Sequence, residues 1–274
     1  QGLLYDGLCP GGANPVFTGL ADDSYTLEMT AIDPATNRDP DPPVANFEID
    51  ATDPETHGGD VDFGDGVTPS RRTQSRRITV SFNGTDSRQL QGFQCRIDSS
   101  DELDWNTCQS PETYSGLADG EHLLEIRAKD QAGNVDQSPI EIEWTIDRTP
   151  PVTTIDSGPD DVTNDDDVEI AFSTNEDATS ECRLDGGPWS SCADPLAVRS
   201  LNGGNPLADG THTVKIRATD LAENLELTPA SVTWEQDTVV PEVEIVAAPA
   251  PFVPLGDADF GWTVKDGDPL VLSP

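Results

Sequence analysis

One acidic loop in the sequence has side-chain oxygens at a spacing that could bind a metal ion. The segment DVDFGDG places Asp60, Asp62 and Asp65 directly before Gly66. Ca²⁺ binds sets of carboxylate and carbonyl oxygens in loops of this kind. The spacing departs by one residue from the D-x-[DN]-x-[DN]-G loop, and no glutamate follows at the bidentate position. The three aspartates are therefore a calcium candidate on an imperfect motif.

The five cysteines are the second group of residues with chemistry of their own. Cys95 and Cys108 form one close pair, and Cys182 and Cys192 form another at a similar spacing. Because no CxxC spacing occurs, a metal site is the less favoured interpretation. Each pair predicts a local disulfide, and disulfides indicate an oxidising compartment. No cysteine precedes Cys9, so we expect it to be unpaired or bonded outside this chain.

The histidines give no support for catalysis. His57, His122 and His212 are the only three, and the last two occupy inward positions of strand-like segments, which core packing explains. The sequence contains no nucleophile elbow, phosphate loop, HExxH or zinc spacing. We therefore predict that the chain is not an enzyme.

Charge narrows the range of partners. The chain has 52 acidic and 15 basic residues, a formal net charge of −37. Nucleic acid and anionic lipid are excluded as partners because no basic patch exists to displace their counterions. No apolar run is long enough to span a membrane. High salt, divalent cations or solubility alone would each account for such an acidic surface.

An internal repeat organises the chain. The segment CRIDSSDELDWNTC at 95–108 is matched by CRLDGGPWSSC at 182–192, and the segment at 116–147 is matched by that at 206–237. A third, more diverged copy of the latter lies at 19–50. Self-similarity at a fixed period indicates a tandem array of one structural unit.

The repeated segments alternate apolar and polar residues with period two, which predicts antiparallel strands. Between two such strands each copy carries an aspartate, an asparagine four residues later, and an acidic residue two further on. We expect the acidic turns at Asp130 and Asp220, and the run Asp165 to Asp167, to be solvated loops. Many short strands separated by Gly, Pro, Asn and Asp turns predict an antiparallel β-sandwich. The full motif sets are Asp33, Asn37, Asp39; Asp130, Asn134, Asp136; and Asp220, Asn224, Glu226.

These features resemble the tandem Ig-like repeats of large prokaryotic surface and secreted proteins. The resemblance rests on C-R-[IL]-D with a nearby tryptophan and second cysteine, G-L-A-D-G-x-H, I-R-A-x-D, and the closing W-x-x-D. It implies an all-β fold of tandem Ig-like antiparallel β-sandwiches, about 90 residues each, and an extracellular or cell-surface location. It implies no catalytic residues, because function on such folds resides in grafted sites.

The repeat pattern predicts four segments. Residues 1–50 match the C-terminal part of a unit, and 239–274 match the N-terminal part of another, complementary to 1–50 of a neighbour or of the next repeat. Complete units are predicted at 51–148 and 149–238. A cation that stiffens a junction between units, near Asp53, Asp147 or Asp237, is a further candidate.

Two functions are consistent with this organisation. The first is a structural repeat segment of an extracellular filament, fibre or stalk, in which copies or adjacent repeats join head to tail; a fragment of a longer adhesin stalk explains the same ends. The alternative is an adhesin or phage-surface module that binds a receptor or glycan. Trp105 and Trp189 lie beside the second cysteines, where we expect them to cover the disulfides rather than to stack on sugars. No cofactor is expected, and calcium is the one candidate.

Overall fold

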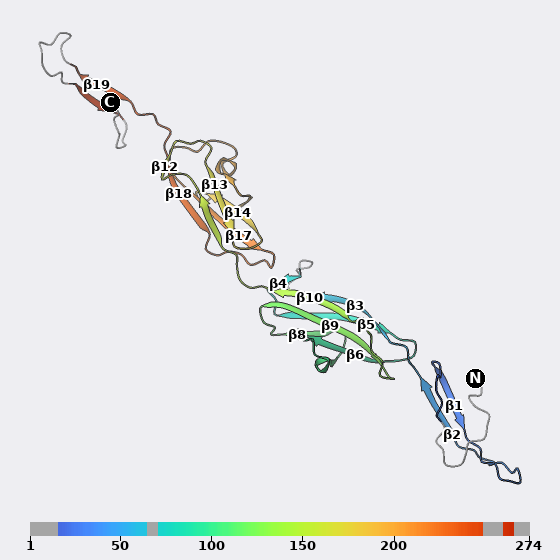
Figure 1. Cartoon of the computed structure of the whole chain (residues 1–274). Coiled ribbons are helices and arrows are strands. Elements are labelled where there is room, and N and C mark those ends of the chain that lie inside the picture. The colour runs from blue at the N-terminus through green and yellow to red at the C-terminus, as the bar shows by residue number, and fades with distance from the viewer. Residues whose placement is uncertain (1–15, 65–70, 249–259, 266–274) are drawn as a thin grey trace. The chain divides into compact units, whose positions relative to one another are not determined.

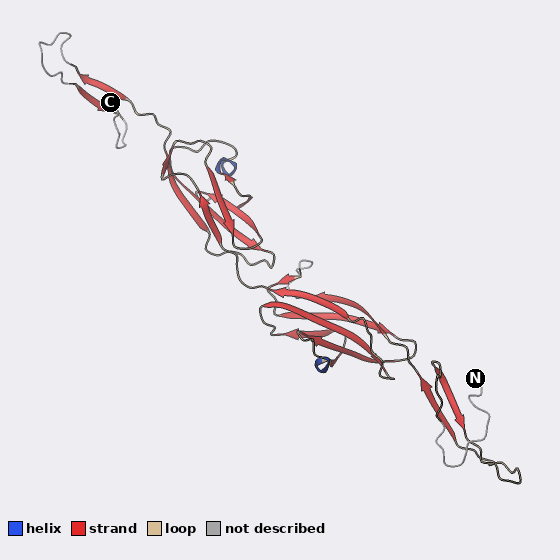
Figure 2. Cartoon of the chain, viewed as in Figure 1, coloured by secondary structure: helices blue, strands red, loops and turns tan. Residues whose placement is uncertain are grey.

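The computed structural model describes residues 16–64, 71–248 and 260–265. In these residues nearly all regular structure is β-strand, and the helices are two short 3-10 segments, η1 (Glu102–Asp104) and η2 (Val198–Asn202) (Figure 2). No helix in this part of the chain is long and apolar enough to cross a membrane. The chain divides into two compact units, residues 1–148 and 149–274.

The first unit contains one complete sandwich of two sheets (Figure 1). Its strands are β3 (Glu55–Asp62), β4 (Arg72–Thr73), β5 (Arg77–Thr85), β6 (Leu90–Ile97), β7 (Asn106–Cys108), β8 (Glu112–Ser115), β9 (Gly120–Asp130) and β10 (Ile140–Ile146). One sheet has the order β4-β10-β9-β6-β7 and the other the order β3-β5-β8. The short β4 pairs parallel to β10, and the other pairs are antiparallel.

The second unit contains a sandwich of the same design. Its strands are β11 (Thr153–Ser157), β12 (Val162–Thr163), β13 (Glu169–Thr174), β14 (Ala178–Leu184), β15 (Ser190–Cys192), β16 (Leu196–Ala197), β17 (Gly210–Asp220) and β18 (Ala230–Gln236). The sheet orders, β12-β18-β17-β14-β15 and β11-β13-β16, repeat those of the first sandwich strand for strand. The all-β prediction of tandem Ig-like antiparallel β-sandwiches is therefore confirmed.

Each unit also contains one two-stranded antiparallel hairpin. The hairpin of the first unit pairs β1 (Asp23–Glu28) with β2 (Val44–Ile49), and that of the second pairs β19 (Val243–Ala247) with β20 (Gly261–Val264). Both lie in sequence outside the complete sandwiches, one before the first and one after the second.

Each sandwich encloses its own core, built by the period-two alternation of its strands. On β9, Leu124, Ile126 and Ala128 are fully buried between the sheets, whereas Arg127 and Lys129 point to the other face and are partly exposed. Residues of both sheets contribute to each core. The first core contains Phe63, Ile78, Val80, Phe82, Leu124, Ile126, Ile142, Trp144 and Ile146, and the second contains Val168, Ile170, Phe172, Leu196, Val198, Val214, Ile216 and Trp234.

Candidate functional site

A buried carboxylate organises the turn that follows the longest strand of each sandwich. Asp130 is fully buried, and its Oδ1 accepts hydrogen bonds from the backbone N–H groups of Gly133 and Asn134 at 2.6 and 2.8 Å. Asp220 accepts from the backbone and the side-chain amide of Asn224, both at 2.8 Å. The expectation that these aspartates are solvated is therefore wrong. Backbone and amide N–H groups take the place of water around each carboxylate.

The last acidic residue of the same motif attaches the first strand of the sandwich. Asp136 Oδ2 accepts from Thr56 N of β3 at 2.8 Å, and Thr56 Oγ1 accepts from Ala128 N at 2.8 Å. In the second sandwich Glu226 accepts from both the backbone N–H (3.1 Å) and the hydroxyl (2.6 Å) of Thr153 on β11. The repeated motif thus closes one turn and joins the two sheets.

Burial and hydrogen bonding act in opposite directions on the Asp136 carboxyl. Burial alone would raise its pKa, but the hydrogen bonds from Thr56 and Ser138 outweigh burial and hold the pKa below the ordinary value. The carboxylate is thus ionised in the folded protein over the neutral pH range, and it acts as an acceptor only.

Three carboxylates of the first unit meet at one place, which we call the junction cluster. Asp50, Asp86 and Asp130 each offer one oxygen atom, and these oxygens lie within 4.8 Å of one another. Asn134 Nδ2 donates to the Asp50 carbonyl oxygen at 3.2 Å, which ties the segment after β2 to the first sandwich. Asp86 Oδ2 accepts from Arg88 N at 2.8 Å, whereas its Oδ1 is buried and has no hydrogen-bond partner among the described residues.

The electrostatics of the junction cluster suit a divalent cation. Burial raises the pKa of Asp50, and the nearby charges of Asp86, Asp130 and Asp22 raise it further, against one hydrogen bond from Thr52 N. Both effects show that the ionised form is disfavoured at this place. Carboxylate oxygens are the ligands that Ca²⁺ takes, and a cation would relieve the repulsion. The residues present therefore fit calcium.

The sequence-predicted calcium residues lie elsewhere. Asp60 and Asp62 are exposed on β3, and Asp65 lies outside the described residues. A site on these three aspartates therefore stays a prediction. Asp53 is exposed and is not a member of the junction cluster; the residue that the structure brings to this place is Asp50, three positions earlier.

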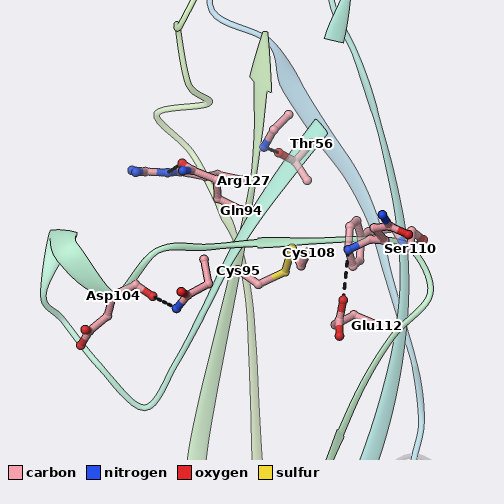
Figure 3. Close-up of a disulfide and its surroundings, with 12 residues drawn as sticks. Thr56, Gln94, Cys95, Asp104, Cys108, Ser110, Glu112 and Arg127 are labelled. Atoms are coloured by element: carbon pink, nitrogen blue, oxygen red, sulfur yellow. Dashed lines mark hydrogen bonds between the residues drawn. A yellow bond between two sulfur atoms is a disulfide. The ribbon is translucent and has the colours of Figure 1, made fainter. Parts of the chain in front are cut away.

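Each sandwich has one disulfide between neighbouring antiparallel strands of its five-stranded sheet. Cys95 on β6 is bonded to Cys108 on β7, with Cα atoms 5.8 Å apart (Figure 3). Cys182 on β14 is bonded to Cys192 on β15, also with Cα atoms 5.8 Å apart. The pairs are those predicted from their matching positions in the repeat. Cys9 lies outside the described residues, so its state stays a prediction.

The tryptophan near each disulfide lies against two arginines. Arg96 and Arg127 place their guanidinium carbons 4.6 and 4.0 Å from the ring centre of Trp105. Trp189 has the same relation to two arginines of the second sandwich, Arg183 at 4.5 Å and Arg217 at 4.2 Å. Sequence reasoning expected each tryptophan to cover its disulfide and missed these cation–π contacts. The alternating arginines of the I-R-A and C-R motifs were the available signal.

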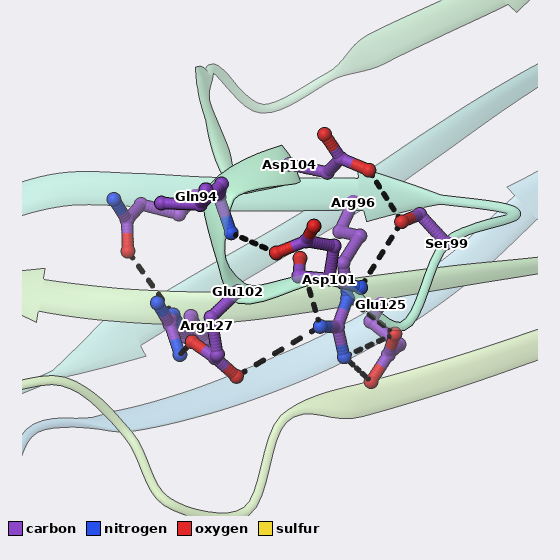
Figure 4. Close-up of polar contacts among 9 residues, drawn as sticks. Gln94, Arg96, Ser99, Asp101, Glu102, Asp104, Glu125 and Arg127 are labelled. Atoms are coloured by element: carbon purple, nitrogen blue, oxygen red, sulfur yellow. Dashed lines mark hydrogen bonds and ion pairs between the residues drawn. The ribbon is translucent and has the colours of Figure 1, made fainter.

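Polar side chains hold the two arginines of Trp105 in place. Arg96 donates to both oxygens of Glu125 at 2.7 Å, and both side chains are largely buried (Figure 4). Arg127 donates to Gln94 at 3.0 Å and to Glu102 at 3.3 Å. The charge-assisted, two-point bond between Arg96 and Glu125 fixes one of the guanidinium planes that lie against the indole.

The two strand histidines are hydrogen-bonded on both ring nitrogens. His122 Nδ1 lies 2.7 Å from Asp98 Oδ2, and Nε2 lies 2.9 Å from the Ala118 carbonyl oxygen. His212 makes the same two contacts, with Asp185 at 2.7 Å and a main-chain carbonyl at 2.8 Å. Burial would lower the pKa of both histidines, but the two acceptors outweigh it and raise the pKa above its ordinary value. The sequence predicted only a core-packing role for these histidines. It did not predict that an aspartate would pair with each of them.

The architecture places both sandwiches in the class of immunoglobulin-like β-sandwich domains. Similar solved structures are fibronectin(III)-like modules and bacterial adhesin repeats. The CbhA fibronectin(III)-like modules of Clostridium thermocellum are 16% identical, with a TM-score of 0.33 over 64% of this chain and 93% of that chain. A tetra-tandem repeat in the extending region of a large adhesion protein is 17% identical, with a TM-score of 0.35 over 92% and 73%.

A third similar structure is a Ca²⁺-stabilized adhesin that helps an Antarctic bacterium reach out and bind ice. It is 15% identical to this chain, with a TM-score of 0.27, over 78% of this chain and 56% of that chain. No protein-family model matches the sequence, and no curated protein sequence matches it. The likeness to these structures is one of fold.

Proposed function

We propose that this chain is a structural repeat segment of an extracellular filament, fibre or surface stalk. The observation that carries the proposal is repetition: the same disulfide-linked sandwich is built twice with the same strand order, and the two hairpins repeat parts of it. Repeats that present the same surfaces suit spacing and load-bearing more than a single chemical reaction. The segments 1–50, 51–148, 149–238 and 239–274 are the proposed units and part-units.

The chemistry of the chain suits the outside of a cell. Each disulfide closes a short loop inside one sheet and resists local unfolding in an oxidising environment. The net charge of −37 would keep neighbouring fibres apart. The junction cluster of Asp50, Asp86 and Asp130 is the place where we propose that calcium binds and holds a unit boundary fixed.

The alternative function, receptor or glycan binding, predicts a sandwich whose loops differ from those of its neighbour. In the second sandwich, the loop that differs from the first sandwich is the segment around η2. This segment contains no aromatic side chain that could stack on a sugar. No described feature of that segment favours a ligand, so the structural role is the function that we propose.

Labelling of intact source cells tests the proposal. An antibody raised against the 274-residue chain should decorate the surface of unpermeabilised cells in extended structures, and protease added outside the cells should remove the label. A label that appears only after lysis would overturn the extracellular structural role. An even surface label without extended structures, displaced by a soluble sugar or receptor, would favour the binding alternative.

A further inference from the structure

The two hairpins expose apolar side chains that complete sandwiches bury. Ile245 on β19 is 64% exposed, and Trp262 on β20 is 50% exposed. Phe260, the residue directly before β20, is 59% exposed. On the β1–β2 side, Met29, directly after β1, is 49% exposed. A two-stranded hairpin is marginally stable in water and needs a further layer on its apolar face. Exposed apolar patches on such faces indicate a binding surface.

The β19–β20 hairpin reproduces one layer of the second sandwich. Ile245 lies opposite Trp262, as Ile155 on β11 lies opposite Phe172 on β13. In both strand pairs the register shifts directly after that isoleucine. All the paired residues of β19 and β20 differ from those of β11 and β13 by 90 positions. The hairpin therefore corresponds to two strands of a three-stranded layer. The described residues contain no third strand beside it.

The β1–β2 hairpin reproduces the opposite layer. Tyr25 lies opposite Phe47, as His212 on β17 lies opposite Trp234 on β18. Tyr25 Oη donates to the carbonyl oxygen four residues earlier at 2.9 Å, and His212 Nε2 makes the same contact at 2.8 Å. The Tyr25 and Phe47 rings stack at 5.6 Å between centroids. The hairpin is therefore the central pair of a five-stranded layer.

In the second sandwich these two layers bury each other's apolar residues. Phe172 of one layer and Trp234 of the other lie in the same core and are 4% and 2% exposed. Their counterparts in the hairpins are less fully covered, and Phe47, at the position of Trp234, is half-buried. Trp262, at the position of Phe172, is 50% exposed, and Met29, at the position of the fully buried Ile216, is 49% exposed.

We propose that the β19–β20 hairpin of one copy of this chain packs on the β1–β2 hairpin of a second copy and completes a hybrid sandwich. The inference rests on the proposed function and names its end-to-end contact. Trp262 occupies the place of Phe172 and covers Phe47, Leu27 and Met29 of the neighbouring copy. Because each copy carries one hairpin of each kind, the contact is heterologous and propagates into a linear polymer.

Complementary single variants test this contact. In Phe47→Asp the β1–β2 face carries a charge, and in Trp262→Asp the β19–β20 face does. The matched controls are Asn46→Asp and Thr263→Asp, which place the same charge on the adjacent, opposite-facing position of each hairpin. All five proteins are compared by sedimentation velocity over a wide concentration range in moderate salt. In the four proteins that keep Trp262, the total tryptophan fluorescence is a second readout.

The wild-type chain and both controls should grow into longer species as concentration rises, with a blue shift of the total tryptophan emission as Trp262 becomes covered. Phe47→Asp and Trp262→Asp should each remain monomeric. Their mixture should form dimers and stop, because one intact face of each kind remains. A wild-type chain that is monomeric throughout, or a Phe47→Asp variant that polymerises normally, would overturn the inference, as would a mixture that stays monomeric while the wild type assembles.

Misfolding is distinguished from a broken contact by the two complete sandwiches, which contain none of the substituted residues. Their disulfides and melting transitions should be unchanged in every variant. Failure of the contact leaves the surface labelling of source cells untouched, so it is distinguishable from failure of the proposed function.

Discussion

At the scale of single residues, carboxylates do most of the organising in this chain. Asp130 closes a turn, Asp136 holds the first strand of a sandwich, and Asp98 orients His122. Each of these carboxylates accepts N–H groups that would otherwise lack partners in a buried or half-buried place. The acidity of the sequence is therefore partly structural, in addition to its effect on the surface.

The strand histidines make stability depend on pH. The pKa of His122 and of His212 is raised in the folded state, so their stabilisation is complete below the unfolded pKa of about 6.5 and is lost as pH rises through the folded pKa. The double variant His122→Tyr, His212→Tyr places at both positions the residue that position 25 carries. We expect the free energy of unfolding of this variant to vary less between about pH 6 and 8.

Denaturant unfolding at several pH values measures this difference. Wild type should lose stability across that range, and the variant should lose less of it. Equal slopes for the two proteins would contradict the role assigned to the histidine–aspartate pairs.

Removing one carboxylate of the junction cluster should raise stability without calcium and lower the stability that is gained with calcium. In chelator, Asp86→Asn should raise the melting temperature of the first unit, because it removes one of three mutually repelling charges. In millimolar Ca²⁺, wild type should gain the stability of a bound ligand, about 2.7 kcal/mol when calcium is at 100 times its Kd, and the variant should gain less.

Differential scanning calorimetry with and without Ca²⁺ provides the measurement, and Asp60→Asn is the matched control for the other calcium candidate. If Asp60→Asn abolishes the calcium response and Asp86→Asn preserves it, the site lies on the acidic loop and the junction cluster is not a calcium site.

At the scale of elements, each sandwich depends on ties between neighbouring strands. The disulfide of the second sandwich links β14 to β15 across a sequence separation of 10 residues. We expect the Cys182→Ala, Cys192→Ala variant to lower the free energy of unfolding of this sandwich by about 3 kcal/mol, through the larger freedom of its unfolded chain.

Native-state hydrogen exchange resolves the two sandwiches in one sample. Amides of β14 and β17 should exchange faster in the variant, while those of β6 and β9 serve as the internal control. Equal acceleration in both sandwiches would mean that they unfold together and would contradict independent units.

At the scale of the whole molecule, net charge is the dominant property. A formal charge of −37 repels itself, and this repulsion destabilises compact states at low ionic strength. Sodium chloride screens interactions beyond about 10 Å at 0.1 M. We therefore expect the melting temperatures of both units to rise as sodium chloride increases from low to physiological concentration. Buffers without magnesium and calcium separate the effect of charge screening from the effect of specific ion binding. Unchanged melting temperatures would contradict the prediction and show that repulsion between the charges does not limit stability.

The sequence alone determined the fold class and the repeat of this protein. Period-two alternation, turn residues and matching cysteine pairs are local signals. Each can be recognised in the sequence because the two faces of a strand, and the two ends of a short loop, are set by residues that are close together in the chain. The same signals assigned His122 and His212 to inward positions of their strands.

Only the tertiary structure decided which distant residues meet. Asp50, Asp86 and Asp130 come from three separate segments, and the hydrogen bonds that bury Asp130 appear only once the turn has folded. The arginines against Trp105 come from two strands that are neighbours in the sheet and distant in sequence. Contacts of this kind depend on strand order and register, and a single sequence does not specify them because many pairings would satisfy the same alternation.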